Sequence, residues 1–186
     1  DNLWKEKATG TVSKWEMDSM CFYYGPHELE NVNRKEYDIV KFNEMPEEPV
    51  IADVYYYRNQ QKPRFVLNRI CGTVLDKDRT KHTVTLLTPD GVCDVKFYAG
   101  AFSYWDKQIS QIEADGTKKT LEKSWFSRGN KIMVTGFRRG EQWVAKKYKD
   151  SVYNHSVQLI VDIDEKGNLD LKTDRIEVDS ANDVAV

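Results

Sequence analysis

Five short runs in the middle of the chain alternate apolar and polar side chains, which is the period of a half-buried β-strand. Turn sequences separate the runs, and Pro89-Asp90-Gly91 is the clearest because proline presets φ and glycine accepts positive φ. An aromatic-rich insert at residues 99–127, expected to form a helix or loop and a polar hairpin at Asp115-Gly116, separates the third and fourth runs. The five predicted strands are residues 70–75, 82–88, 92–98, 131–137 and 142–148.

The order of these elements is three strands, the aromatic insert and two more strands. This order is typical of a small Greek-key barrel of the oligonucleotide-binding (OB) type. Gly72, in the first strand, would allow the sharp coil that such a barrel needs. We therefore predict a mainly β protein built on a five-stranded Greek-key OB-fold barrel, with an N-terminal helix and additional C-terminal strands.

The residues before the barrel predict a connecting segment over 1–63. Residues 12–24 show a helical period that Gly25-Pro26 would end. Residues 28–48 are polar and acidic, and Met45 to Pro49 is expected to be an extended linker. Val50 to Tyr57 is β-branched and aromatic, which predicts a strand that Gln60 to Pro63 should break.

The barrel is expected to span residues 64–149, and residues 150–186 to hold short strands and an acidic tail. The two C-terminal strands are predicted at 157–163 and 169–171, joined by a turn at 165–168. The last residues, from about Ser180, have the composition of a loose tail.

Charge is distributed unevenly, although the formal net charge is only −2. Residues 1–63 carry 8 Lys and Arg against 12 Asp and Glu, and residues 150–186 carry 3 against 9. The barrel segment carries 17 against 9, a surplus of +8. A basic surplus favours a polyanionic partner. Basic residues that only solvate the strand faces would explain the same surplus about equally well.

Candidate catalytic chemistry is sparse. Three widely spaced cysteines (Cys21, Cys71 and Cys93) and three dispersed histidines form no metal-spaced cluster or disulfide framework, so neither a metal nor another cofactor is expected. A reducing, cytoplasmic setting fits best. The run Val161 to Asp164 resembles the paired aspartates of nucleotidyl transferases, but it leads into a turn sequence, so an alternating strand explains it better. We expect neither a membrane segment nor a signal peptide.

A binding constellation is better supported, because single-stranded nucleic acid is held by cations along a groove and by aromatic faces on which bases stack. Phe97, Phe102 and Phe137 are expected in the core. Tyr98, Trp125 and Trp143 could be core or barrel-closing residues, and for Tyr98 binding is an equal alternative. The candidate nucleic-acid-binding residues are Lys77, Arg79, Lys81, Thr83, Thr85, Lys96, Tyr98, Arg138, Arg139, Lys146 and Lys147.

The segment Cys21-Phe22-Tyr23-Tyr24-Gly25-Pro26-His27-Glu28-Leu29 resembles the GFYISGHPL segment of the bacterial DNA polymerase III alpha subunit. Phe22, Tyr23, His27 and Leu29 match, and the other positions depart. In that family the segment lies between a helix-hairpin-helix region and a C-terminal OB domain. Arg69 to Val74 resembles the start of that domain's barrel.

The resemblance implies a piece of a replicative polymerase whose palm and phosphoesterase-like domains lie elsewhere, as the absence of an initiator Met also suggests. The chain by itself is then not expected to be catalytic. Its implied partners are single-stranded DNA, the rest of the alpha chain and other replisome subunits, with no membrane. One alternative is a barrel that docks replisome proteins through its aromatic insert and acidic ends. A third reading is a barrel-based nuclease that uses the carboxylates near Asp162.

Overall fold

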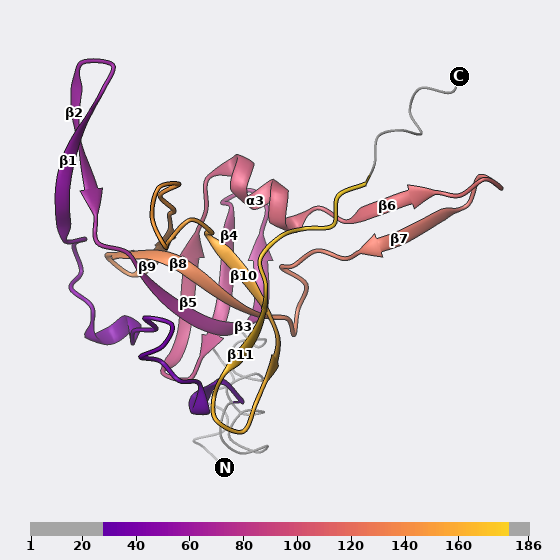
Figure 1. Ribbon diagram of the computed structural model, residues 1–186, viewed down its shortest axis with the longest axis horizontal. Coiled ribbons are helices and arrows are strands. Elements are labelled where there is room, and N and C mark those ends of the chain that lie inside the picture. Colours follow the sequence, from indigo (N-terminus) through magenta and orange to yellow (C-terminus); the bar gives the residue numbers. More distant parts are fainter. Residues whose placement is uncertain (1–27, 179–186) are drawn as a thin grey trace, which may run out of the picture.

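The computed structural model describes residues 28–178, so the predicted helix at 12–24 and most of the polymerase-like segment lie outside it. The described part is mainly β and contains a closed five-stranded barrel (Figure 1). The barrel strands are β3 (Asn68–Asp78), β4 (Thr83–Thr88), β5 (Gly91–Lys96), β8 (Lys131–Arg139) and β9 (Gln142–Ala145).

Strand pairing closes the barrel in the order β3, β4, β5, β9, β8 and back to β3. All these pairs are antiparallel except β5–β9, which is parallel. A helix, α3 (Ala99–Asp106), follows the third barrel strand. This arrangement confirms the predicted fold class, an OB-like Greek-key barrel. The last barrel strand is shorter than predicted, because it ends at Ala145 rather than continuing to Tyr148.

The barrel interior is filled by the inward residues of all five strands and by aromatic rings of the insert. Trp125 and Trp143 are 1% and 0% exposed, which places both in the core. Phe97, Phe102 and Phe137 are also buried, as predicted. Gly72 allows close packing, since a Cβ atom there would lie 2.9 Å from the carbonyl oxygen of Leu87. The structure thus shows a close approach of β3 to the backbone of β4 at Gly72, whereas the sharp coil expected at this position stays a prediction.

The segment before the barrel packs against it more closely than its polar composition suggested. It forms two short 3₁₀ helices, η1 (Glu28–Asn31) and η2 (Phe42–Glu44). Leu29, Val32 and Ile39 are buried in a second hydrophobic cluster beside β3 and β8. They are isolated apolar residues in a polar, acidic stretch, and the composition of that stretch predicted a connecting segment rather than a packed one.

Gln60 to Pro63 does not break the strand before it, so that expectation was wrong. β1 (Ile51–Tyr57) and β2 (Gln60–Phe65) form an antiparallel hairpin, which we call the arm. Figure 1 shows the arm projecting away from the barrel. Pro63 fits because both strands of this two-stranded ribbon are edges, where an N–H donor can be spared. The boundary expected between residues 63 and 64 falls inside β2.

The remaining strands match the predicted pattern closely. β6 (Ile109–Ile112) and β7 (Lys118–Glu122) form the hairpin expected around Asp115-Gly116, and it projects from another side of the barrel (Figure 1). β10 (Val157–Ile163) pairs with β8 and with β11 (Leu169–Lys172), which adds two strands to the barrel sheet. No helix within residues 28–178 is long and apolar enough to cross a membrane.

Candidate nucleic-acid interface

The outward faces of β5 and β9 bring two of the predicted residues together. Lys96 pairs in register with Val144 across the parallel β5–β9 ladder. Two residues beyond each member of this pair, the Lys146 ammonium lies 5.6 Å from the centroid of the Tyr98 ring. Tyr98 is 64% exposed, so it is not a core residue and its ring is available at the surface.

Tyr148 connects this barrel surface to the arm. Its hydroxyl accepts a hydrogen bond of 2.8 Å from the backbone N–H of Phe65, the last residue of β2. The Lys146 ammonium lies 5.8 Å from the Tyr148 ring, and the Arg64 guanidinium lies 4.9 Å from the same ring. Arg64 also lies 5.7 Å from Tyr55, so one guanidinium contacts a ring of the barrel region and a ring of the arm.

The same face of the arm continues the alternation of rings and cations. Tyr55 pairs across the strands with Lys62, and Tyr57 pairs with Gln60. The Arg58 guanidinium and the Lys62 ammonium lie 5.2 Å and 5.4 Å from the Tyr57 ring.

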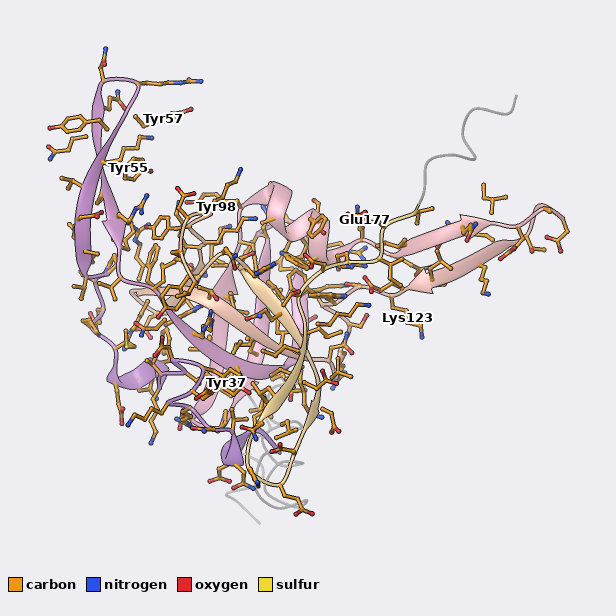
Figure 2. All side chains as sticks on the ribbon, viewed as in Figure 1. Tyr37, Tyr55, Tyr57, Tyr98, Lys123 and Glu177 are labelled. Atoms are coloured by element: carbon orange, nitrogen blue, oxygen red, sulfur yellow. The ribbon has the colours of Figure 1, made fainter. Side chains whose placement is uncertain are left out.

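We call the combined surface the aromatic–cation ladder; Figure 2 shows Tyr98 on the barrel and Tyr55 and Tyr57 on the arm. The ladder consists of Tyr98, Lys146, Tyr148, Arg64, Tyr55, Lys62, Tyr57 and Arg58.

Four other predicted residues lie on the barrel surface beside the ladder. The Thr85 hydroxyl donates a 2.8 Å hydrogen bond to Asp94 on the neighbouring strand. The Lys96 ammonium donates to the carbonyl oxygen of Lys81, which fixes the turn before β4 against β5. Thr83 pairs in register with Lys96 and is half-buried. This surface is polar, but the Thr85 hydroxyl and the Lys96 ammonium already have partners within the fold.

Lys77 and Arg79 lie at a different place, where the turn after β3 meets the end of α3. Both side chains form ion pairs with Asp106, at 2.5 Å and 2.9 Å. Burial disfavours the charge on Asp106, but hydrogen bonds from Lys77 and Ser124 and the two nearby cations outweigh it and lower the pKa of this carboxyl. Lys77 is therefore chiefly an internal partner, whereas the Arg79 side chain is 73% exposed.

The two arginines of the β8–β9 turn have different surroundings. Arg138 is buried, and its guanidinium donates to the carbonyl oxygens of Phe42, Met45 and Gly140. It thereby holds the N-terminal segment onto the barrel. Arg139 is exposed, and its guanidinium lies 5.1 Å from the Phe137 ring. Lys147 is exposed just beyond β9.

Sequence reasoning missed the arm half of the ladder. The signal was present in the run Tyr55-Tyr56-Tyr57 with Arg58, Lys62 and Arg64 close behind. Alternation along a strand puts Tyr55 and Tyr57 on one face, and the hairpin places Lys62 opposite Tyr55. Reading Gln60 to Pro63 as a break removed the second strand and therefore hid this face.

The residues singled out for other chemistry have structural surroundings in the described part of the chain. Within 28–178, no group of three or more His, Cys, Asp or Glu side chains gathers to hold a metal ion. Burial raises the pKa of Cys71 and of Cys93 to about 12, so both thiols stay protonated at neutral pH. Asp164 accepts hydrogen bonds from the backbone N–H groups of Lys166 and Asn168, which makes it a turn residue.

Comparison with known proteins adds one decisive similarity. The chain is 47% identical over 175 residues to the probable DNA polymerase YorL of Bacillus subtilis (strain 168). It has the same identity to the DNA-directed DNA polymerase of Bacillus phage SPbeta. The chain is related to DNA polymerases.

The alignment covers 94% of this chain but only 13% of the length of each polymerase. The similarity therefore connects the chain to one segment of a much longer protein. No protein-family model matches the chain. No solved structure matches it either.

Proposed function

We propose that this chain is a single-stranded-DNA-binding module of a replicative DNA polymerase and is not catalytic by itself. The observation that carries the proposal is the aromatic–cation ladder on the outer surface of an OB-like barrel. The relationship to DNA polymerases supports a role in DNA replication, and we place that role in the cytoplasm as part of the proposal. The partners are the single strand, the remainder of the polymerase chain and other replisome subunits.

The chemistry of the ladder suits a flexible single strand. Exposed rings offer π faces on which bases of any sequence stack, and the cations between them can neutralise phosphates. Each stacked base contributes about 1–3 kcal/mol, whereas a cation over an exposed ring contributes about 0.5–1 kcal/mol. A base can therefore replace a cation at a ring, and the released cation can bind the adjacent phosphate.

The finer assignment rests on the resemblance to the C-terminal region of the DNA polymerase III alpha subunit. In that assignment the barrel holds the template strand close to the polymerase active site, which lies in another part of the parent chain. The barrel pairing from β3 to β9 has the strand order that this assignment requires. The parent chain, not this segment, carries the polymerase activity.

Fluorescence anisotropy with labelled oligothymidylate tests the proposal. We expect Tyr98→Ala to weaken binding by about 5- to 150-fold, which corresponds to one lost stacked base. Tyr104→Ala is the matched control, because this tyrosine is 43% exposed on α3 but lies outside the ladder. Absence of salt-sensitive binding by the unaltered chain at low ionic strength would refute the proposed function.

A further inference from the structure

We propose that the arm is a second single-strand-binding segment, so that affinity depends on whether an oligonucleotide is long enough to reach it from the barrel. The inference rests on the proposed function, since both parts of the ladder would bind the same strand. It adds a division of the site into a barrel part around Tyr98 and an arm part around Tyr55 and Tyr57.

The two strands of the arm are joined by a tight turn. Arg58 and Asn59 have φ values of 50° and 62°, and the paired residues Tyr57 and Gln60 flank them directly. Two central residues with positive φ are the pattern of a type I′ turn, whose twist matches that of the strands it joins. The Tyr57 ring is therefore placed by a tight hairpin rather than by a long loop.

The two faces of the arm differ in chemistry. One face carries Tyr55, Tyr57, Lys62 and Arg64. The other carries Val54, Tyr56 and Pro63, of which Tyr56 is 76% exposed.

The charge of the arm also favours a polyanion. Residues 51–65 contain three basic residues and one acidic residue, a net charge of +2. The single carboxylate, Asp53, lies 3.9 Å from the Arg64 Nε atom. A protein partner would need an apolar or acidic surface, whereas a single strand uses both the rings and the cations of this face.

The spacing of the rings suits bases. Tyr55 and Tyr57 are two residues apart on one strand, so their Cα atoms are about 7 Å apart along it. This is about twice the 3.4 Å spacing of nucleotides along one DNA strand. An interval of about 7 Å leaves room for one base between the two tyrosine side chains.

Arg64 makes the arm continuous with the barrel. Its Nε atom is buried and has no hydrogen-bond partner, while its guanidinium contacts Tyr148 and Tyr55. The anchoring hydrogen bond between the Phe65 N–H and the Tyr148 hydroxyl lies beside it. A strand that leaves Tyr98 can thus pass Tyr148 and Arg64 before it reaches Tyr55.

Binding measured against oligonucleotide length tests this division. We expect the unaltered chain to bind oligothymidylate of about 20 nucleotides more tightly than one of about 6, a length within the range that a single OB barrel holds. The double variant Tyr55→Ala/Tyr57→Ala should lose at least about tenfold on the long oligonucleotide and remain unchanged on the short one. Tyr98→Ala should lose affinity for both.

A charge variant tests the arm without altering its rings. Arg58→Gln/Lys62→Gln changes only exposed tip residues, and it should lower the slope of log affinity against log salt by about 1.4 on the long oligonucleotide. If the arm variants bind the long oligonucleotide as tightly as the unaltered chain does, the inference is overturned. In that case a weakened Tyr98→Ala variant would show that the barrel still binds and that the proposed function stands. If the unaltered chain binds neither length, the proposed function fails together with the inference.

Discussion

The arm and the β6–β7 hairpin are both two-stranded antiparallel ribbons that project from the same barrel (Figure 1). The arm, residues 51–65, contains three tyrosines, one phenylalanine and a net charge of +2. The other hairpin, residues 109–122, contains no aromatic residue and has a net charge of −1. Two ribbons of the same general type therefore carry opposite net charges and different aromatic content.

The two ribbons also differ in how they are anchored. The arm is connected to the barrel by an aromatic hydroxyl and by a guanidinium lying between rings. The β6–β7 hairpin is anchored by Arg175, which is 4% exposed and forms an ion pair with Glu122. The Arg175 guanidinium also donates to the carbonyl oxygens of Tyr104, Trp105, Lys107 and Lys123.

This difference separates exposed ligand chemistry from buried anchoring chemistry. Near the tip of the arm, Tyr57, Arg58 and Lys62 are exposed, so a ligand could replace their mutual contacts at small cost. At Arg175 the charge is enclosed, and removing it leaves several buried acceptors unpaired. Two hairpins with the same secondary structure can therefore differ in whether their charged groups are exposed, as at the tip of the arm, or enclosed, as at Arg175.

The largest expected effect is on the anchor of the β6–β7 hairpin. Arg175→Met should destabilise the protein by about 3 kcal/mol, because Glu122 and the carbonyl groups lose a buried partner. Urea denaturation would measure the change in unfolding free energy. Lys172→Met is the control, since Lys172 also pairs with Glu122 but is 38% exposed, and it should cost less. The folded Arg175→Met variant should bind DNA with unchanged affinity. A loss of DNA affinity together with the loss of stability would contradict the distinction between the two ribbons.

Acid should weaken the β6–β7 side of the molecule. Burial opposes the charge on Glu122, but hydrogen bonds from Lys172 and Arg175 and their charges prevail and lower its pKa from 4.5. A carboxyl with a lowered folded pKa stabilises the protein fully above its ordinary pKa and loses that contribution as pH falls through the folded value. Thermal unfolding between pH 7 and pH 3 should therefore show stability falling below about pH 4.5. Glu122→Gln should reduce this pH dependence, and an unchanged profile would contradict it.

A matched pair of charge variants tests whether the arm and the β6–β7 hairpin contribute differently to DNA binding. Lys118→Gln/Lys119→Gln removes two exposed cations from β7, as Arg58→Gln/Lys62→Gln removes two from the arm. We expect the β7 variant to leave the salt dependence of binding to a long oligonucleotide unchanged, against a decrease of about 1.4 for the arm variant. Equal decreases in anisotropy titrations would show that net charge, rather than the ladder, controls binding.

The smallest expected effects concern the two turns. Gly116 has a φ of 85°, so Gly116→Ala should cost about 1 kcal/mol of folding stability. Asn59→Gly should stabilise the arm turn by about 0.5 kcal/mol, since glycine is favoured at the second position of a type I′ turn. Thermal denaturation would measure both changes. A loss of stability in Asn59→Gly would show that the Asn59 side chain has a role beyond its backbone conformation.

The barrel could be predicted from the sequence because each strand alternates inward and outward residues, as in Cys93, Val95 and Phe97 of the third run. Clear turn sequences such as Pro89-Asp90-Gly91 marked where one strand ends and the next begins. The burial of Leu29, Val32 and Ile39 was not predicted, since they are isolated apolar residues in a polar, acidic stretch whose composition indicated an exposed connection. The predicted domain boundaries stay a prediction.

The candidate site could be predicted only where a strand defined the face of a residue. Tyr98 and Lys146 come together because β5 and β9 run in parallel register. Arg138 has the same charge and similar sequence surroundings to Arg139, yet it is buried by the 42–45 segment, a contact across about 95 residues that no local pattern contains. The arm face was missed because glutamine and proline in β2 concealed a strand.

The tight turn at Arg58-Asn59 has a kinetic consequence. A ribbon whose tip is already in its final conformation orders little chain when DNA arrives, so association should be limited by encounter rather than by rearrangement. Encounter is accelerated by complementary charge, whereas residence time depends on contacts made after docking. Removing Arg58 and Lys62 should therefore slow association, and removing the Tyr55 and Tyr57 rings should hasten release.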